Sequence, residues 1–215
     1  AATAEAIKIP TDTALTGTAT QILAALDDVE GHKGNITVSG IPTSTAAADV
    51  NTIAGLTTGV VRATISSATN VAETLAAITN VNAADIIAYT TTDTSVDASD
   101  LVALKAKVDT FNTASVTTIT EAYNTASLTT EVLDAEALKA GANVEITGGA
   151  ISAGDLNILA SDATIGNITA TITDGAVTTT LGAIAKVDAN DTITFKTTDA
   201  SVDASDLVDL KVKVD

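Results

Sequence analysis

The chain has no cysteine, methionine or tryptophan among its 215 residues, and its only histidine is His32. Without cysteine it forms no disulfide, no zinc–thiolate site and no thiol nucleophile. A serine nucleophile would need His32 as its base, and no Gly-x-Ser-x-Gly turn accompanies it. Because His32 follows Gly31, we expect it to be a cation at a helix C-terminus. Aromatic residues make up only 2% of the chain, too few for the walls of a sugar-binding cleft. These absences predict that the protein is not an enzyme.

Basic residues are also few: the chain has 10 Lys and Arg but 27 Asp and Glu, so its net charge is −17. Such a surface repels phosphates and anionic lipids, so we expect no nucleic-acid partner. No apolar run approaches the roughly 18 residues of a membrane span, which predicts no membrane insertion. The chain begins without a methionine or a signal peptide and stops within a repeat. We therefore expect a fragment of a larger protein, or a chain processed at its N-terminus.

The chain contains copies of itself. Residues Ser95–Asp109 (SVDASDLVALKAKVD) return as Ser201–Asp215 (SVDASDLVDLKVKVD), with alanine replaced by Asp209 and by Val212. Two long repeats follow from this return, at residues 1–109 and 110–215, each with about four helix–strand units. The stretch 110–130 is longer than a regular repeat needs.

Helix caps and alternating apolar residues predict the elements inside each repeat. Capping residues such as Thr18, Asn70, Asp97, Ser152 and Asp203 begin helices, and further helices are expected near 46–54, 130–140 and 177–185. Strands are expected at 4–9, 35–39, 60–65, 85–90, 116–120, 143–147, 166–173 and 191–196.

A helix and a strand thus alternate at roughly regular intervals, about eight times along the chain. Strands joined by such short helical connections pair in parallel. A fixed short period is typical of stacked repeats that bury their faces on one another. The sequence therefore predicts an α/β repeat protein, an elongated solenoid of helix–strand units with a parallel sheet. An all-β solenoid is the alternative, because segments such as Val177–Thr180 have a strand-like composition.

Two stretches, Ala48–Ile65 (ADVNTIAGLTTGVVRATI) and Thr92–Leu101 (TDTSVDASDL), carry a family resemblance. The chain resembles the tandem repeats of giant extracellular or cell-surface proteins of marine cyanobacteria and other aquatic bacteria. The resemblance covers most of the chain and rests on Thr-, Ala- and Asp-rich repeats. It implies an extracellular, stalk-like or coat-forming role, and it carries no catalytic residue across.

Aspartates recur in both copies of the repeated element and have two interpretations. As helix caps, Asp97 and Asp203 would accept backbone N–H groups, and the carboxylates three residues later would favour the positive helix end. As oxygen ligands converging from a turn, they would bind calcium. The candidate metal ligands are Asp93, Asp97, Asp100, Asp199, Asp203 and Asp206.

The leading hypothesis is a structural repeat segment of a secreted bacterial surface protein, which serves as a spacer, an S-layer-like coat or a filament component. Its expected partners are further copies of itself or neighbouring repeats of the same protein. The alternative is an adhesin or an ice- or glycan-binding module that uses a Thr-rich sheet face. Thr169, Thr171, Thr173, Thr192 and Thr194 would lie on that face.

Overall fold

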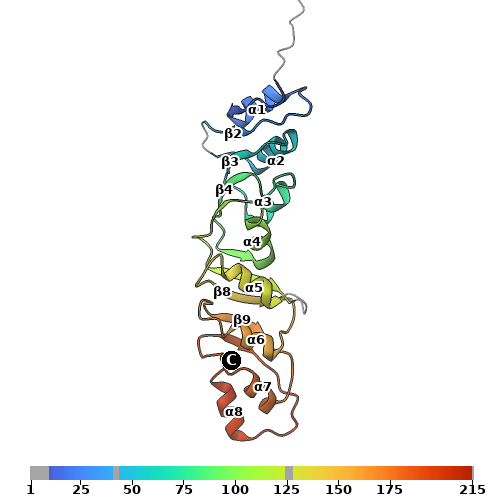
Figure 1. Cartoon of the computed structure of the whole chain (residues 1–215). Coiled ribbons are helices and arrows are strands. Elements are labelled where there is room, and N and C mark those ends of the chain that lie inside the picture. The colour runs from blue at the N-terminus through green and yellow to red at the C-terminus, as the bar shows by residue number, and fades with distance from the viewer. Residues whose placement is uncertain (1–9, 41–43, 124–127, 215) are drawn as a thin grey trace, which may run out of the picture. The chain divides into compact units, whose positions relative to one another are not determined.

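The structure, a computed structural model, describes residues 10–40, 44–123 and 128–214 (Figure 1). The chain divides into two compact units. The first unit comprises residues 1–92 and 103–112, and the second residues 93–102 and 113–215. The strand predicted at residues 4–9 lies outside the described residues. The described part of the chain folds into eight α-helices and two parallel sheets. The predicted α/β class is therefore confirmed, and the all-β alternative is wrong.

The first unit holds a five-stranded sheet in the order β1-β2-β3-β4-β6, with three helices that follow β1, β2 and β3 in the chain. Figure 1 shows these helices in sequence order beside the strands. The strands are β1 (Leu15–Gly17), β2 (Ile36–Val38), β3 (Val61–Ile65), β4 (Ile86–Thr90) and β6 (Thr110–Asn112). The helices are α1 (Ala19–Leu26), α2 (Ala47–Leu56) and α3 (Val71–Ala77).

The second unit holds a sheet in the order β10-β9-β8-β7-β5, and its helices contact one another in the pairs α5 with α6, α6 with α7 and α7 with α8. The strands are β5 (Ser95–Asp97), β7 (Thr118–Ala122), β8 (Asn143–Thr147), β9 (Ile168–Thr171) and β10 (Thr192–Thr194). The helices are α5 (Leu128–Glu136), α6 (Ala153–Leu159), α7 (Val177–Ala183) and α8 (Ala204–Lys211). Helix α4 (Ala98–Lys105) begins in the second unit and ends in the first.

Strand pairing keeps a nearly constant sequence separation in both sheets. We call a strand and the helix that follows it a strand–helix segment. Within each sheet, neighbouring strands pair in parallel, and chain order is kept except that β4 pairs with β6 and β5 with β7. Opposed residues are 21 to 25 positions apart in the sequence. Examples are Leu15 with Ile36, Arg62 with Ile86, Ala88 with Thr110, Thr118 with Asn143, Val144 with Ile168 and Thr169 with Thr192.

The predicted caps explain where several helices begin. Thr18 Oγ1 accepts the backbone N–H of Gln21 at 3.3 Å, and Gln21 Oε1 accepts the backbone N–H of Thr18 at 2.9 Å. This reciprocal pair is the predicted capping box of α1. Asn70 caps α3 through the N–H of Glu73 at 2.7 Å, and Ser152 caps α6 in the same way. Each cap satisfies an N–H group that has no partner within its helix.

Alternation along the strands places the core between each sheet and its helices. In β3, Val61, Ala63 and Ile65 are buried, whereas Arg62 and Thr64 are exposed. The residues that face the helices are small and β-branched, and such side chains pack well on a pleated surface. Tyr89 of β4 is the largest fully buried side chain among the described residues.

Polar residues at strand starts repeat one link in both units. Asn35 Oδ1 accepts the backbone N–H of Val60 at 2.9 Å, across to the next strand. In the second unit, Asn143 Oδ1 accepts the backbone N–H of Asn167 at 3.0 Å in the same way. These bonds satisfy the amides directly before β3 and β9 and help to fix the register between neighbouring strands.

Two lysines repeat a second link on the helix side. Lys107 Nζ donates to the carbonyls of Ile78 and Val81 in the preceding segment, at 3.2 Å each. Lys213 Nζ, its counterpart in the repeated element, donates to the carbonyls of Ala185 at 3.3 Å and Val187 at 2.8 Å. The bonds to Val81 and Val187 are equivalent, because these valines occupy matching positions in the two long repeats, whereas Ile78 matches Ile184 and not Ala185.

The expectation that His32 is a helix-end cation is wrong. Helix α1 ends at Leu26, and His32 is 1% exposed beside Thr57 of the next segment. Neither ring nitrogen has a hydrogen-bond partner among the described residues. A Gly before a His predicts a helix end, but here the chain continues past α1 and turns inward before β2.

Candidate functional site

The first copy of the repeated element uses its aspartates as caps. Asp97 Oδ1 accepts the backbone N–H groups of Ser99 at 3.0 Å and Asp100 at 3.3 Å, and the Ser99 hydroxyl at 2.6 Å. Burial raises the pKa of Asp100, and the negative charge of Asp97 raises it further. The capping interpretation of Asp97 is confirmed at the start of α4.

The second copy repeats this arrangement at α8. Asp203 Oδ1 accepts the backbone N–H of Ser205 at 2.8 Å and its hydroxyl at 2.6 Å. These bonds, first the hydroxyl and then the backbone N–H, lower the pKa of Asp203. Two copies of the same sequence thus begin their helices with the same cap.

The other candidate ligands lie in different settings. Asp199 Oδ2 accepts the backbone N–H of Val177, the first residue of α7, at 2.8 Å. Asp206 Oδ2 accepts the hydroxyl of Thr178 at 3.1 Å, so both carboxylates join the last segment to α7. Asp93 precedes β5 at the start of the second unit. Within the described ranges, no three His, Asp or Glu side chains form a group that could hold a metal ion.

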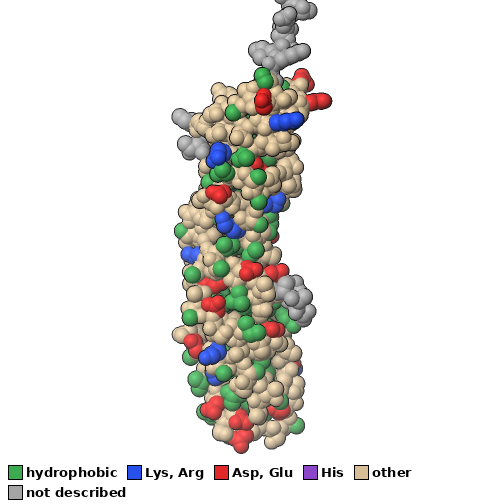
Figure 2. Space-filling model, viewed as in Figure 1, with side chains coloured by type: hydrophobic (Ala, Val, Ile, Leu, Met, Phe, Trp, Pro, Cys, Tyr) green, Lys and Arg blue, Asp and Glu red, His purple; other side chains and the backbone are tan. Residues whose placement is uncertain are grey.

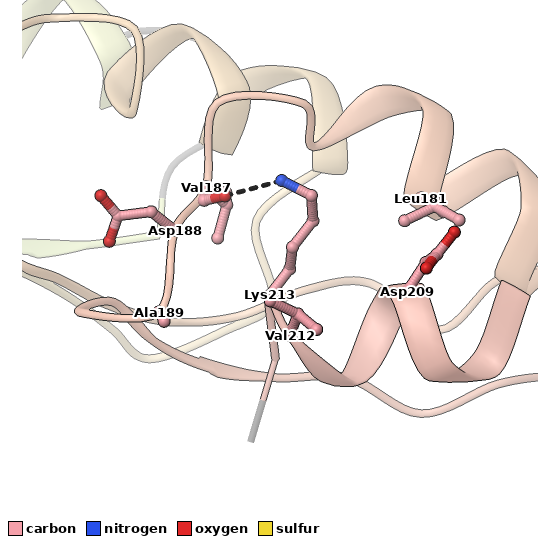
Figure 3. A pocket seen from close by; sticks show the side chains of 7 residues that line it. All are labelled: Leu181, Val187, Asp188, Ala189, Asp209, Val212 and Lys213. Atoms are coloured by element: carbon pink, nitrogen blue, oxygen red, sulfur yellow. Dashed lines mark hydrogen bonds between the residues drawn. The ribbon is translucent and has the colours of Figure 1, made fainter.

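A pocket of about 480 Å³ opens beside the C-terminal end of α8 (Figure 3). Lys213 crosses it to donate to the carbonyl of Val187, so its ammonium group already has a partner. Asp188 and Asp209 lie on opposite sides of this lysine. Its lining therefore offers apolar contacts and two carboxylates, and no nucleophile paired with a base. The lining residues are Leu181, Val187, Asp188, Ala189, Asp209, Val212 and Lys213.

Large apolar side chains are exposed on and next to α8. Leu207 is 44% exposed, Val208 62% and Val212 63%. Figure 2 shows acidic side chains around apolar ones on the visible face of this C-terminal region. One further large apolar residue, Ile158 of α6, is similarly exposed among the described residues. Leu207 and Val208 belong to α8, and Val212 directly follows it.

Glu121 of the second unit is buried, although no sequence motif predicts a buried carboxyl group there. It is 5% exposed on the inward side of β7, which it shares with Ile119, and lies opposite Ile146 of β8. Its Oε2 has no hydrogen-bond partner among the described residues. Burial, followed by the charges of Asp97 and Glu131, raises the pKa of Glu121 to about 7. The alternation from Ile119 is the sequence signal that could have revealed it.

Glu136 ends α5 and is 1% exposed. Its Oε1 accepts the backbone N–H of Gly141 at 2.7 Å, whereas its Oε2 has no partner among the described residues. Burial raises the pKa of Glu136 to about 7, although the Gly141 N–H opposes this shift. No sequence signal marks this position, because a Glu at a helix end is usually solvated.

The exposed threonines pair across β9 and β10. Thr169 lies opposite Thr192 and Thr171 opposite Thr194, and all four side chains are exposed. The predicted Thr-rich face is therefore present on these two strands. It is interrupted at β8, where Glu145 lies opposite Thr169.

Comparison with protein-family models, with curated proteins and with solved structures finds no match to this chain. Of the helices that the structure describes, none is both long and apolar enough to cross a membrane.

Proposed function

We propose that this chain is a structural repeat segment of a secreted bacterial surface protein, a spacer, coat or filament component that performs no catalysis. Its strand–helix segments are coils of an elongated α/β solenoid. The observation that carries this proposal is the parallel pairing of neighbouring strands within each sheet, at a nearly constant separation in sequence. In a solenoid each coil contacts only its neighbours, so repeating the coil adds length without a new fold.

The equivalent bonds of Lys107 to the carbonyl of Val81 and of Lys213 to the carbonyl of Val187 support the same proposal. They join one coil to the preceding coil in each long repeat, as a copied building block requires. The net charge of −17 keeps such a segment soluble and away from anionic surfaces. The resemblance to repeats of giant aquatic bacterial proteins supports an extracellular or cell-surface location.

A second candidate function, an adhesin or an ice- or glycan-binding module, is favoured by the facing threonine pairs of β9 and β10. It requires a flat and regular array, which Glu145 interrupts on the neighbouring strand. Binding to ice or to a glycan that is lost in Thr171→Lys would favour this candidate over the structural one.

Negative-stain electron microscopy with sedimentation tests the structural proposal. We expect slender rods, because coils that add along one axis give a particle much longer than it is wide. A compact globule with the sedimentation coefficient of a sphere would contradict the solenoid.

The same experiment in millimolar calcium tests the candidate metal ligands. If the aspartates bind calcium as well as cap helices, rods stiffen or assemble only with the ion, and Asp97→Asn with Asp203→Asn removes this response. If they serve only as caps, particles with and without calcium are the same. The asparagine variants suit this comparison because asparagine still caps a helix.

A further inference from the structure

The acceptor motif for N-linked glycans, Asn-x-Thr, occurs three times in the chain, at residues 35–37, 167–169 and 190–192. In this motif the asparagine amide receives the sugar, and the transferase recognises the threonine hydroxyl two residues later. The motif is too short to mark a site by itself, because asparagine and threonine are both frequent here. What decides is whether the folded chain can present the motif to a transferase. The structure places the three motifs in different settings.

The first motif lies on a strand that is paired on both sides. Asn35 directly precedes β2, and its Oδ1 already accepts the backbone N–H of Val60 at 2.9 Å. Thr37 lies opposite Thr16 of β1 and Arg62 of β3. Bringing this motif into an active site would pull a strand out of the middle of its sheet, and such an opening is costly.

The second motif is held in the same way at the start of β9. The backbone N–H of Asn167 donates to Asn143 Oδ1 at 3.0 Å, and its carbonyl accepts the N–H of Val144 at 2.9 Å. Thr169 lies between β8 and β10, with which it pairs on its two sides. Both side chains of the motif are exposed, but the backbone that carries them is fixed.

The third motif begins on a turn. The carbonyl of Asp188 accepts the N–H of Asp191 at 3.2 Å, which closes a β-turn with Ala189 and Asn190 at its centre. Asp188 Oδ1 also accepts the N–H of Asn190 at 2.7 Å. Asn190 is exposed, and its side chain has no hydrogen-bond partner among the described residues. An exposed turn with small and polar residues is accessible to enzymes at little cost to the fold.

The first long repeat has the same turn without the motif. Ala84 and Ile86 stand there in place of Asn190 and Thr192. Asn82 Oδ1 accepts the N–H of Ala84 at 2.9 Å, as in the second long repeat. Ala84 is exposed although β4, which follows it, is paired on both sides. Exposure of this turn therefore belongs to the segment itself, and the second long repeat adds an acceptor motif to it.

We infer that Asn190 is the acceptor of an N-linked glycan, transferred by an oligosaccharyltransferase from a lipid-linked oligosaccharide pyrophosphate. This inference rests on the proposed function, because a secreted chain passes such a transferase on its way out of the cell. The Asn190 Nδ2 forms a bond to the anomeric carbon of the donor sugar. The bond from that carbon to the pyrophosphate oxygen breaks, and the lipid pyrophosphate leaves with its electron pair. The amide loses one proton to a base of the transferase.

Glycosylation of the purified chain tests the inference, with a transferase that requires only Asn-x-Thr and with a lipid-linked oligosaccharide as donor. Peptides of residues 33–39, 165–171 and 188–194 are the controls, and we expect all three to be modified. In the folded chain we expect the glycan at Asn190 alone, as located by mass spectrometry of proteolytic fragments. A folded chain without a glycan at Asn190, or with equal modification of all three motifs, would overturn the inference.

Substitutions separate the motif from the turn. Thr192→Val keeps the β-branched shape and removes the hydroxyl, so we expect no glycan, whereas Thr192→Ser retains it. Thr194→Val is the matched control, because Thr194 is exposed on the same strand outside the motif. Ala84→Asn with Ile86→Thr moves the motif to the equivalent turn of the first long repeat, and we expect one additional glycan there. A transplanted motif that stays unmodified would contradict the role of the turn.

Electron microscopy of the same samples distinguishes this inference from the proposed function. Rods that carry no glycan at Asn190 would overturn the inference and leave the solenoid intact. Compact particles that carry the glycan would support Asn190 as the acceptor and refute the proposed function.

Discussion

Glu121→Gln is expected to raise the free energy of unfolding by about 2–3 kcal/mol at pH 8 and to change it little at pH 4.5. The glutamate is 5% exposed on the inward side of β7, where ionisation has no compensating cation. At pH 8 the folded chain holds a buried carboxylate that the neutral amide replaces. At pH 4.5 the folded glutamate is already protonated, so the replacement removes little.

The sign of the pH dependence follows from the two pKa values. The pKa of Glu121 is about 7 in the folded chain and 4.5 without the fold. The folded state therefore binds more protons between these values. The stabilisation is fully present below about pH 4.5 and is lost as pH rises through 7. Glu136, with the same folded pKa, adds to this slope.

Urea unfolding from pH 4.5 to 8 measures the effect. Glu145→Gln is the matched control, because Glu145 is exposed on the outward side of β8, one strand away. It should keep the slope of the parent chain, while Glu121→Gln flattens it. Equal slopes in all three proteins would contradict the burial of an ionisable Glu121.

The two copies of the repeated element allow the same substitution to be made in two environments. Leu101→Ala is expected to cost about 2–5 kcal/mol, because it removes a fully buried side chain and leaves a cavity. Leu207→Ala makes the same change in the same local sequence, where the side chain is 44% exposed. In the monomeric chain it is expected to cost less than about 1 kcal/mol.

Midpoints of chemical unfolding at low protein concentration measure both variants under the same conditions. Because the local sequence is nearly the same, helix propensity and capping cancel in the comparison. Similar losses for the two variants would mean that Leu207 is buried in solution, and that the last segment already has a partner in the monomer.

Much of the fold is predictable because its signals are local. The caps at Thr18, Asn70 and Ser152 fix helix starts through hydrogen bonds within the first helical turn. The alternation in residues 166–173 fixes which side of β9 is buried. Val177–Thr180 has a strand-like composition, yet it begins α7, because Val177 and Thr180 lie on the buried side of a helix.

The features that sequence does not reveal depend on distant neighbours. Strands β1, β5 and β6 have three residues each and are stabilised by pairing with neighbouring strands. Three residues are too few to show an alternation of apolar and polar side chains. Residues 95–97 and 201–203 illustrate this directly, since the same three amino acids form a strand only where β7 is beside them.

In the candidate site, too, local features were predictable and features that depend on distant residues were not. The sequence places Asp97 and Asp203 at helix starts, and the structure confirms them as caps. Whether they also bind calcium stays a prediction. His32 and Glu136 are buried by residues distant in the sequence, and no motif around either residue predicts this burial.

In the proposed solenoid each strand–helix segment contacts only its neighbours, so the chain should tolerate removal of one whole segment. Deleting Asn143–Gly166 removes one full period, because Val144 pairs with Ile168 and Asn167 then takes the place of Asn143. This deletion places β9 beside β7. Deleting Asn143–Gly154 instead removes half of that period and breaks the spacing. We expect the full-period deletion to keep a cooperative thermal transition by circular dichroism and the half-period deletion to lose it. If both deletions unfold the chain alike, the segments are not interchangeable coils and the solenoid is contradicted.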